Sequence, residues 1–158
     1  MATIPLTVRG AEKLKQELAR LKSVERHAVI QAISEARAQG DLSENAEYEA
    51  AKDKQGFIEG RILEIEGKLA AGQVINPATL NGEGRVVFGA TVDLEDEDSG
   101  AQVTYQIVGD DEADLKQGLI SISSPIARAL IGKVDGDVAE VQAPGGLRHY
   151  EIIAVRYR

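Results

Sequence analysis

The chain lacks several features on which whole classes of protein depend. It has no cysteine and no tryptophan, only two histidines, and aromatic residues make up 4% of its 158 residues. Without cysteine it can form neither a disulfide nor a cysteine-based zinc site. His27 and His149 leave little for a histidine metal site or a catalytic triad. The absence of cysteine fits a cytoplasmic protein, which is the localisation we expect.

Long apolar runs are missing as well. No stretch of about 18 apolar residues is available to cross a membrane. Residues 1–5 have neither the charged region nor the apolar region of a signal peptide, so we expect no membrane partner. Hydrophobic residues still make up 43% of the chain. That is enough to build a core in one ordinary domain or two small ones.

Positive charge is scarce in the second half of the chain. Residues 76–158 carry 7 Lys and Arg against 14 Asp and Glu, and so account for −7 of the net charge of −8. Sequence-independent binding to DNA requires clustered Lys and Arg, so we expect the free protein to bind duplex DNA weakly or not at all. An acidic surface instead favours a protein partner with a basic face.

Two long segments without proline carry helical periodicity. In residues 44–72 the apolar positions step by alternating threes and fours, which predicts the narrow seam of a coiled coil. The seam residues are Tyr48, Ala51, Gln55, Ile58, Ile62, Ile65 and Leu69. Residues 9–39 carry a similar seam that slips at Glu25, as in a stutter that locally unwinds the coil. Its residues are Leu14, Leu18, Leu21, Val29, Ile33 and Ala36. The short turn around Gly40 predicts antiparallel pairing, and the narrow stripe favours an arm in solvent over a hairpin packed on the second domain.

From residue 83 onward the pattern changes to the alternation typical of β-strands. Strands are predicted at 86–94, 103–107, 119–122, 138–142 and 147–155. A short helix is predicted with Ser124 as its N-cap and Pro125 at its first position. The expected fold is therefore α+β. An antiparallel coiled-coil hairpin occupies residues 1–76, a linker residues 77–82, and an antiparallel sheet with one short helix residues 83–158.

The turn between the two helical segments contains two carboxylates, Asp41 and Glu44. Their spacing fits a capping box, in which the first side chain accepts from a backbone N–H and the acid reaches back to the cap residue. Ser43 is a competing N-cap. The same two acids, at the end of a long arm, could instead deliver catalytic or metal-binding oxygens to another molecule. The spacing alone favours capping, although fixed acids in a first helical turn can serve both purposes.

Three motifs resemble those of the bacterial Gre transcript cleavage factors, and the similarity extends over essentially the whole chain. The sequence GDLSENAEY at 40–48, with QGF at 55–57 and EGRI at 59–62, resembles the tip and the returning helix of that family. The other two motifs are VGDDEA at 108–113 and SPIARALIGK at 124–133. The resemblance implies that the C-terminal domain folds like FK506-binding prolyl isomerases. It also implies that this domain docks on the rim of the secondary channel of bacterial RNA polymerase, while the coiled coil enters the channel.

This resemblance implies a transcription elongation factor and not an enzyme. It would stimulate the polymerase's own cleavage of a backtracked RNA 3′ end, and any association with DNA would come through the polymerase. Asp41 and Glu44 would help to hold a Mg²⁺ shared with the polymerase and to orient the attacking water. Two carboxylates suit Mg²⁺ but do not make a tight site, so we expect no cofactor in the free protein.

The resemblance also gives roles to residues away from the acidic pair. Arg37 and Lys52 correspond to basic positions that would face the extruded RNA, and a solvated surface charge is the alternative for each. Their small number agrees with the less basic branch of the family. The docking residues implied by the last motif are Ser123, Ser124 and Pro125, although helix initiation alone would explain Ser124 and Pro125.

Two other functions are compatible with the same sequence. A prolyl isomerase would share the fold of the second domain, but fold alone does not confer activity. The aromatic residues available for its pocket are few, namely Phe88, Tyr105, Tyr150 and Tyr157. A polymerase regulator without cleavage activity would enter the same channel, but its tip would be expected to differ from the pair Asp41 and Glu44.

Overall fold

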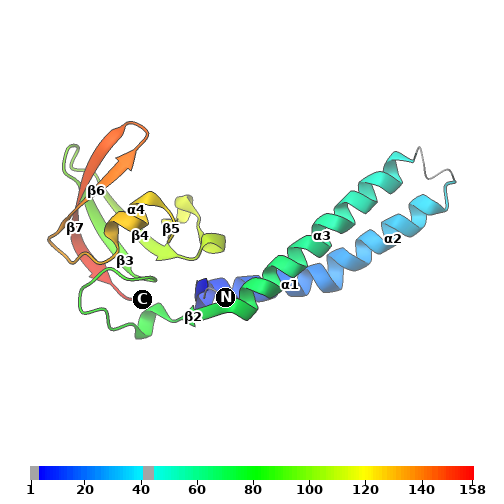
Figure 1. Cartoon of the computed structure of the whole chain (residues 1–158), viewed down its shortest axis with the longest axis horizontal. Coiled ribbons are helices and arrows are strands. Elements are labelled where there is room, and N and C mark those ends of the chain that lie inside the picture. Colours follow the sequence, from blue (N-terminus) through cyan, green and yellow to red (C-terminus); the bar gives the residue numbers. More distant parts are fainter. Residues whose placement is uncertain (1–3, 41–44) are drawn as a thin grey trace. The chain divides into compact units, whose positions relative to one another are not determined.

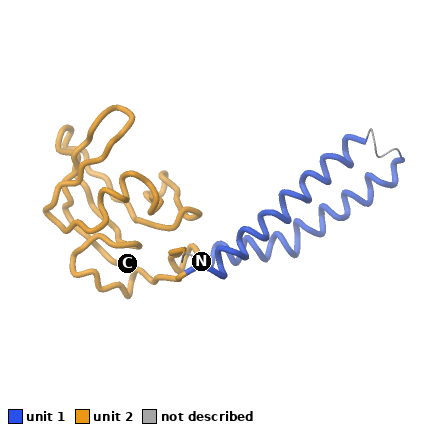
Figure 2. The backbone as a smooth tube through the Cα atoms, viewed as in Figure 1, with its two compact units in different colours: residues 1–2, 11–72 blue, residues 3–10, 73–158 orange. Residues whose placement is uncertain are grey.

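The computed structural model describes residues 4–40 and 45–158 (Figure 1). Contacts divide these residues into two compact units (Figure 2). Residues 11–72 form the first, and residues 4–10 together with 73–158 form the second. Residues 4–10 therefore belong with the C-terminal half of the chain. Among the residues described, no helix is both long and apolar enough to cross a membrane.

The first unit is a hairpin of two helical arms, as predicted. One arm consists of α1 (Val8–Arg20), a π-helical segment (Leu21–Glu25) and α2 (Arg26–Arg37). The other is α3 (Ala46–Ala71), which returns beside it (Figure 1). The seams face the interior, since their most buried members are Leu14, Val29, Ala36, Ala51, Ile58, Ile62 and Ile65. The predicted apolar stripe therefore holds the two arms together.

The π-helical segment explains the slip of the seam at Glu25. Its hydrogen bond runs from the N–H of Arg26 to the carbonyl of Leu21, five residues back. Such a turn accommodates one extra residue and rotates the following side chains around the helix axis. Val29 then reaches the interior, where it packs with Ile58 and Ile62. The slip in periodicity is thus realised as a local change of helix type.

Two short strands near the ends of the hairpin were not predicted. β1 (Ile4–Thr7) pairs with β2 (Gly72–Ile75) in a two-stranded sheet. Gly72 also ends α3, as the sequence indicated. The predicted linker at 77–82 begins with a 3₁₀ turn (Pro77–Thr79), in which Pro77 is buried.

The second unit is built on a five-stranded sheet with the strand order β5-β4-β3-β7-β6. The strands are β3 (Thr91–Asp96), β4 (Gln102–Val108), β5 (Leu119–Ser121), β6 (Val138–Ala143) and β7 (Gly146–Arg156). The predicted α+β domain is confirmed, with one difference. β5 pairs with β4 in parallel, whereas the other pairs are antiparallel. The sheet curls against α4 (Pro125–Leu130), whose Leu130 is fully buried in its core (Figure 1).

Residues 86–90, predicted as a strand, do not join this sheet. The predicted core positions Val86, Phe88 and Ala90 are buried. Gly89 between them is buried too, and its φ of +89° interrupts the extended backbone. The N–H of Val86 donates to the carbonyl of Lys133 at 2.7 Å, and that of Gly89 to the carbonyl of Ile107 at 2.8 Å. The alternation therefore identified core positions correctly but not the backbone conformation.

Candidate functional site

At the tip of the hairpin, Asn45 joins the ends of α2 and α3. Its Oδ1 accepts from the N–H of Tyr48 at 3.0 Å and so caps α3. Its Nδ2 donates to the carbonyl of Ala36 in α2 at 2.8 Å. The N-cap of α3 is therefore Asn45, and the interpretation of Asp41 or Ser43 as that cap is wrong.

Asp41 and Glu44 lie outside the described residues. They are flanked by Gly40, with a φ of +114°, and by Asn45, which is held by both helices. Because Asn45 supplies the cap, capping of α3 no longer accounts for the two acids. Among the residues that the structure does describe, no group of three or more His, Asp or Glu side chains is arranged to hold a metal ion.

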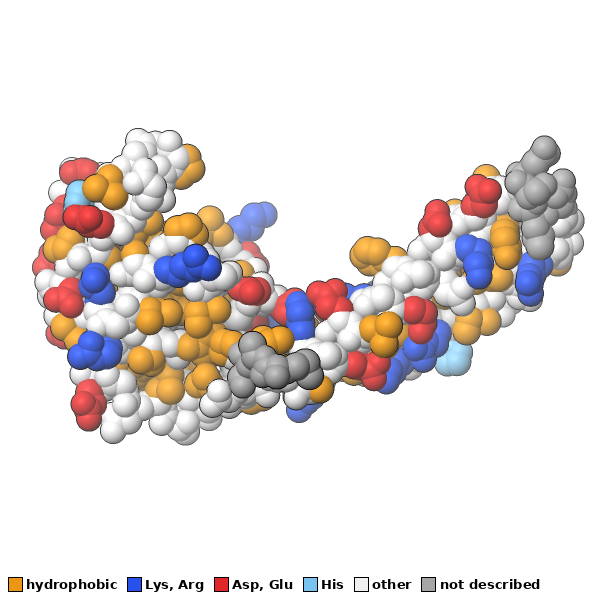
Figure 3. Space-filling model, viewed as in Figure 1, with side chains coloured by type: hydrophobic (Ala, Val, Ile, Leu, Met, Phe, Trp, Pro, Cys, Tyr) orange, Lys and Arg blue, Asp and Glu red, His pale blue; other side chains and the backbone are white. Residues whose placement is uncertain are grey.

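An open cleft of about 220 Å³ lies beside the tip, between the two arms. It is lined by Ile30, Ile33 and Arg37 from α2, and by Tyr48, Lys52 and Gln55 from α3. The two predicted RNA-facing residues thus come from different helices and line one cleft. Figure 3 shows Lys and Arg side chains beside hydrophobic ones at this end of the hairpin. Cations next to apolar and aromatic groups suit a nucleic-acid strand, whose phosphates are charged and whose bases have apolar faces.

The three predicted docking residues lie at the start of α4. Ser124 caps this helix, since its Oγ accepts from the N–H of Ala127 at 3.2 Å, and Pro125 occupies the first turn. Ser123 is exposed, and its hydroxyl donates to Oδ1 of Asp110 at 2.8 Å. Ser123 and Pro125 are exposed and Ser124 is half-buried, and the docking role of all three stays a prediction.

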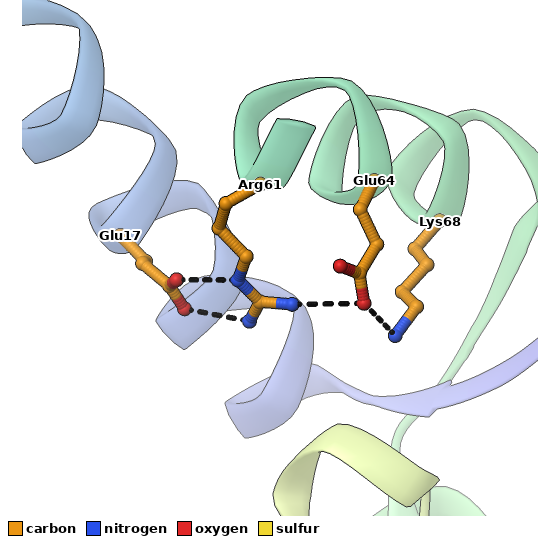
Figure 4. Close-up of polar contacts among 4 residues, drawn as sticks. All are labelled: Glu17, Arg61, Glu64 and Lys68. Carbon is orange, nitrogen blue, oxygen red and sulfur yellow. Dashed lines mark hydrogen bonds and ion pairs between the residues drawn. The ribbon is translucent and has the colours of Figure 1, made fainter. Parts of the chain in front are cut away.

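Ion pairs connect the two arms farther from the tip than the cleft. Arg61 on α3 makes two hydrogen bonds to the carboxylate of Glu17 on α1, at 2.7 and 2.9 Å (Figure 4). Arg26 makes two more to Glu59, both at 2.8 Å. The hydrogen bond from Arg61 lowers the pKa of Glu17, and that from Arg26 lowers the pKa of Glu59. These bidentate pairs specify geometry as well as charge. Together with the buried seam, they support the register that places Arg37 and Lys52 in one cleft.

Comparison with known proteins identifies the family. The family model described as the N-terminal part of transcription elongation factors GreA and GreB matches residues 4–74, and the corresponding C-terminal model matches residues 81–157. The chain belongs to the GreA/GreB family of transcription elongation factors. It is 75% identical to the transcription elongation factor GreA of Verminephrobacter eiseniae over 100% of both chains, and 74% identical to that of Ralstonia nicotianae over 99% of both. The predicted membership is confirmed.

Solved structures of GreA/GreB relatives are also similar to the chain. The crystal structure of GreA factor homolog 1 from Thermus thermophilus is 29% identical, covers 98% of this chain and 99% of its own, and gives a TM-score of 0.45. The GreA/GreB factor of Nitrosomonas europaea is 22% identical, with 99% and 100% covered and a TM-score of 0.43. The assignment to the GreA/GreB family rests on the sequence matches.

Proposed function

We propose that this protein stimulates the cleavage of backtracked RNA by the active site of bacterial RNA polymerase and is not itself a nuclease. The observation that carries the proposal is the pair of acids at the hairpin tip. Asn45 is the cap of α3, so the role of helix cap does not explain the presence of Asp41 and Glu44. Membership of a transcription elongation factor family supplies the setting in which such acids act.

Hydrolysis of the RNA backbone would use carboxylate oxygens at the tip of the hairpin. Hydrolysis of a phosphodiester is assisted by metal ions that activate water and stabilise the leaving oxygen. Asp41 and Glu44 are the residues that would contribute to a Mg²⁺ shared with the polymerase, because carboxylate oxygens are the ligands this ion prefers. Two carboxylates are too few for a tight Mg²⁺ site, so the remaining ligands would belong to the polymerase.

The cleft beside the tip would receive the extruded RNA 3′ end. Arg37 and Lys52 present positive charge from two helices, so both can approach the phosphates of one strand. Tyr48, half-buried in the seam, contributes to the wall of the cleft and to the packing of the hairpin. The excess of acid in residues 76–158 opposes tight binding to free duplex DNA.

Docking on the rim of the secondary channel would fall to the second unit. Ser123 and Pro125 are exposed at the start of α4, next to a loop that internal hydrogen bonds hold in place. An acidic domain is suited to approach a basic protein surface, because complementary charge steers the encounter.

The double variant Asp41→Asn, Glu44→Gln tests the proposal on stalled bacterial elongation complexes with labelled RNA. It keeps the shape of the tip but removes the charge that a Mg²⁺ ligand needs. We expect it to lose cleavage stimulation by about tenfold or more while polymerase affinity is unchanged, which is the pattern of an interaction made only during the reaction. Ser123→Arg is the matched control for docking and should weaken binding and cleavage together. Normal stimulation by the folded double variant, or RNA cleavage by the protein alone with Mg²⁺, would contradict the proposal.

The structure gives no support to a prolyl isomerase. Phe88 is buried in the core of the second unit, and Tyr105, Tyr150 and Tyr157 pack against it. The few aromatic residues available for such a pocket are thus used in packing.

A further inference from the structure

The motif at 108–113 has no role in the function proposed above. It contains a 3₁₀ turn (Asp110–Glu112) whose first and last residues bind different segments of the second unit. Oδ1 of Asp110 accepts from the hydroxyls of Ser121 and Ser123, the latter at 2.8 Å. The first residue of the turn therefore holds the loop that precedes α4.

Glu112, at the other end of the turn, contributes to the caps of two helices. Its Oε2 accepts from the N–H of Gly109, which precedes its own turn, and from the N–H of Thr7, which precedes α1, both at 3.1 Å. Its Oε1 accepts from the hydroxyl of Thr7. The same Thr7 hydroxyl oxygen accepts from the N–H of Gly10 at 3.0 Å. The carboxylate is buried, with Glu112 only 9% exposed.

The arrangement at Thr7 is a capping box whose acid comes from a distant part of the chain. In an ordinary capping box, the acid at the third helical position accepts from the N–H of the cap residue. Here that position is Gly10, and Glu112 takes the place of the acid although it lies 105 residues from Thr7. A Cβ on Gly10 would lie 2.0 Å from Cδ of Glu112. The carboxylate therefore occupies the space that a side chain at position 10 would need. We name Thr7, Gly10 and Glu112 the α1 cap.

We propose that the turn Asp110–Glu112 serves both docking and RNA cleavage, because it holds the loop that carries Ser123 (the docking loop) and also the first turn of α1. Helix α1 begins in the second unit and continues into the hairpin, so the α1 cap fixes the residues from which the first arm starts. Two residues away, Asp110 fixes the loop that carries Ser123. Glu112 is thus a positioning residue that acts through α1, and this inference rests on the proposed roles of the docking loop and the tip.

The α1 cap can be tested without polymerase by hydrogen exchange on the full chain. In Glu112→Ala the amides of Thr7 and Gly10 should exchange about tenfold faster or more, because local opening there becomes easier, while amides of β3 keep their protection. Thr7→Val should have the same effect at Gly10, and Thr7→Ser, which keeps the hydroxyl, should match the parent protein. Unchanged exchange at Gly10 in both Glu112→Ala and Thr7→Val would overturn the α1 cap.

Gly10→Ala provides a test whose sign depends on Glu112. Alanine is normally favoured over glycine within a helix, but here its Cβ would displace the Glu112 carboxylate. Gly10→Ala should therefore lower the thermal unfolding midpoint in the parent protein and raise it in the Glu112→Ala background. A change of the same sign in both backgrounds would contradict the capping geometry.

The positioning role is tested by separating cleavage rate from affinity on stalled elongation complexes. Glu112→Ala and Thr7→Val should lower the cleavage rate at saturating protein by about tenfold or more, since small misplacements far from the chemistry have effects of this size. The half-saturating concentration should change less than about threefold, and Thr7→Ser should behave like the parent. Asp110→Ala should instead raise the half-saturating concentration. An unchanged saturating rate in Glu112→Ala would overturn the positioning role. If the parent protein gave no stimulation, the proposed function would fail and the exchange experiment would still decide the α1 cap.

Discussion

The two units of the molecule are stabilised in different ways. The second unit has a contiguous core between the sheet and α4, formed by Val86, Phe88, Ala90, Val92, Leu94, Ile107, Ile120, Ala127, Leu130, Ala139 and Ile152. The buried residues of the hairpin are instead spread along its two arms, with Val29, Ile58 and Ile62 packed together as one small cluster. Its arms are joined in addition by bidentate ion pairs. Each helix of the hairpin has only one face to bury against the other. Charged side chains therefore contribute to the register of one arm against the other.

This difference corresponds to the two tasks that we propose. A docking domain needs a rigid surface, which a packed core provides. An arm that carries acids into a channel needs to be slender and correctly aligned, and the ion pairs supply alignment without adding bulk. The hairpin therefore depends more on ion pairs at its surface, which respond to pH and salt. The second unit adds ion pairs between β3 and β7, Arg156 with Asp93 and Arg148 with Asp96, to a larger buried core.

The largest effect should come from emptying the core of the second unit. Ile107→Ala and Ile62→Ala remove the same group from the two units, at positions 0% and 2% exposed. Ile107→Ala should lower the free energy of unfolding by about 2–5 kcal/mol, and Ile62→Ala by about 2 kcal/mol, because the thin hairpin can collapse around the lost side chain. Urea unfolding should be followed by tyrosine near-UV circular dichroism, since three of the four tyrosines lie in the second unit, and at 222 nm. Leu63→Ala, 72% exposed, is the control for the hairpin and should change little. Equal losses at residues 62 and 107 would remove the contrast between the units.

The hairpin could be predicted almost completely from the sequence because its determinants are local. The seams and the slip at Glu25 are visible as periodicity, and the structure confirms them. The sheet was predicted less well, because pairing joins distant segments. β1 and β2 have four residues each and lie more than sixty positions apart in the sequence, so no local pattern predicts that they pair. Residues 86–90 have the alternating apolar sequence of a strand, but their hydrogen bonds are made with Lys133 and Ile107, which are distant in the sequence.

In the candidate site, too, features set by local sequence could be predicted, whereas those that depend on contacts between distant segments could not. Arg37 and Lys52 could be placed near the tip, but their common cleft follows from the register of two helices. Asn45 was missed because several cap-forming residues stand close together there, and the spacing of a capping box drew attention to Asp41. The link from Glu112 to Thr7 spans 105 residues, and no rule based on neighbouring residues could have found it.

A smaller effect is expected at the tip, where Asn45→Ala removes both the cap of α3 and the hydrogen bond to Ala36. The free energy of unfolding of the hairpin should fall by about 1 kcal/mol, which is typical of a lost N-cap. Asn45→Asp keeps an acceptor for the N–H of Tyr48 but not the donor to Ala36, so it should fall between Asn45→Ala and the parent in urea unfolding at 222 nm. Asp41→Asn should leave this transition unchanged. A comparable loss in Asp41→Asn would show that Asn45 is not the dominant cap.

The smallest expected effect is that of the ion pairs between the two arms on the stability of the hairpin. Its dependence on pH tests whether these pairs make the hairpin sensitive to acid. Arg61 and Arg26 hold the pKa values of Glu17 and Glu59 below the ordinary value of 4.5. The unfolded chain therefore takes up protons at these groups before the folded hairpin does. Their stabilisation is complete above about pH 4.5 and is lost as the pH falls through the lowered values. Exposed pairs contribute little each and are screened by salt, so the midpoint of thermal unfolding at 222 nm should fall slightly more steeply below pH 4.5 in low salt than in 1 M salt. The double variant Glu17→Gln, Glu59→Gln removes two of the groups whose pKa is lowered and keeps two others, Glu64 and Asp96, so it should reduce that difference. If the double variant kept the same dependence on pH and salt, the register of the hairpin would depend on the seam alone, and the contrast between the two units would be one of size and not of kind.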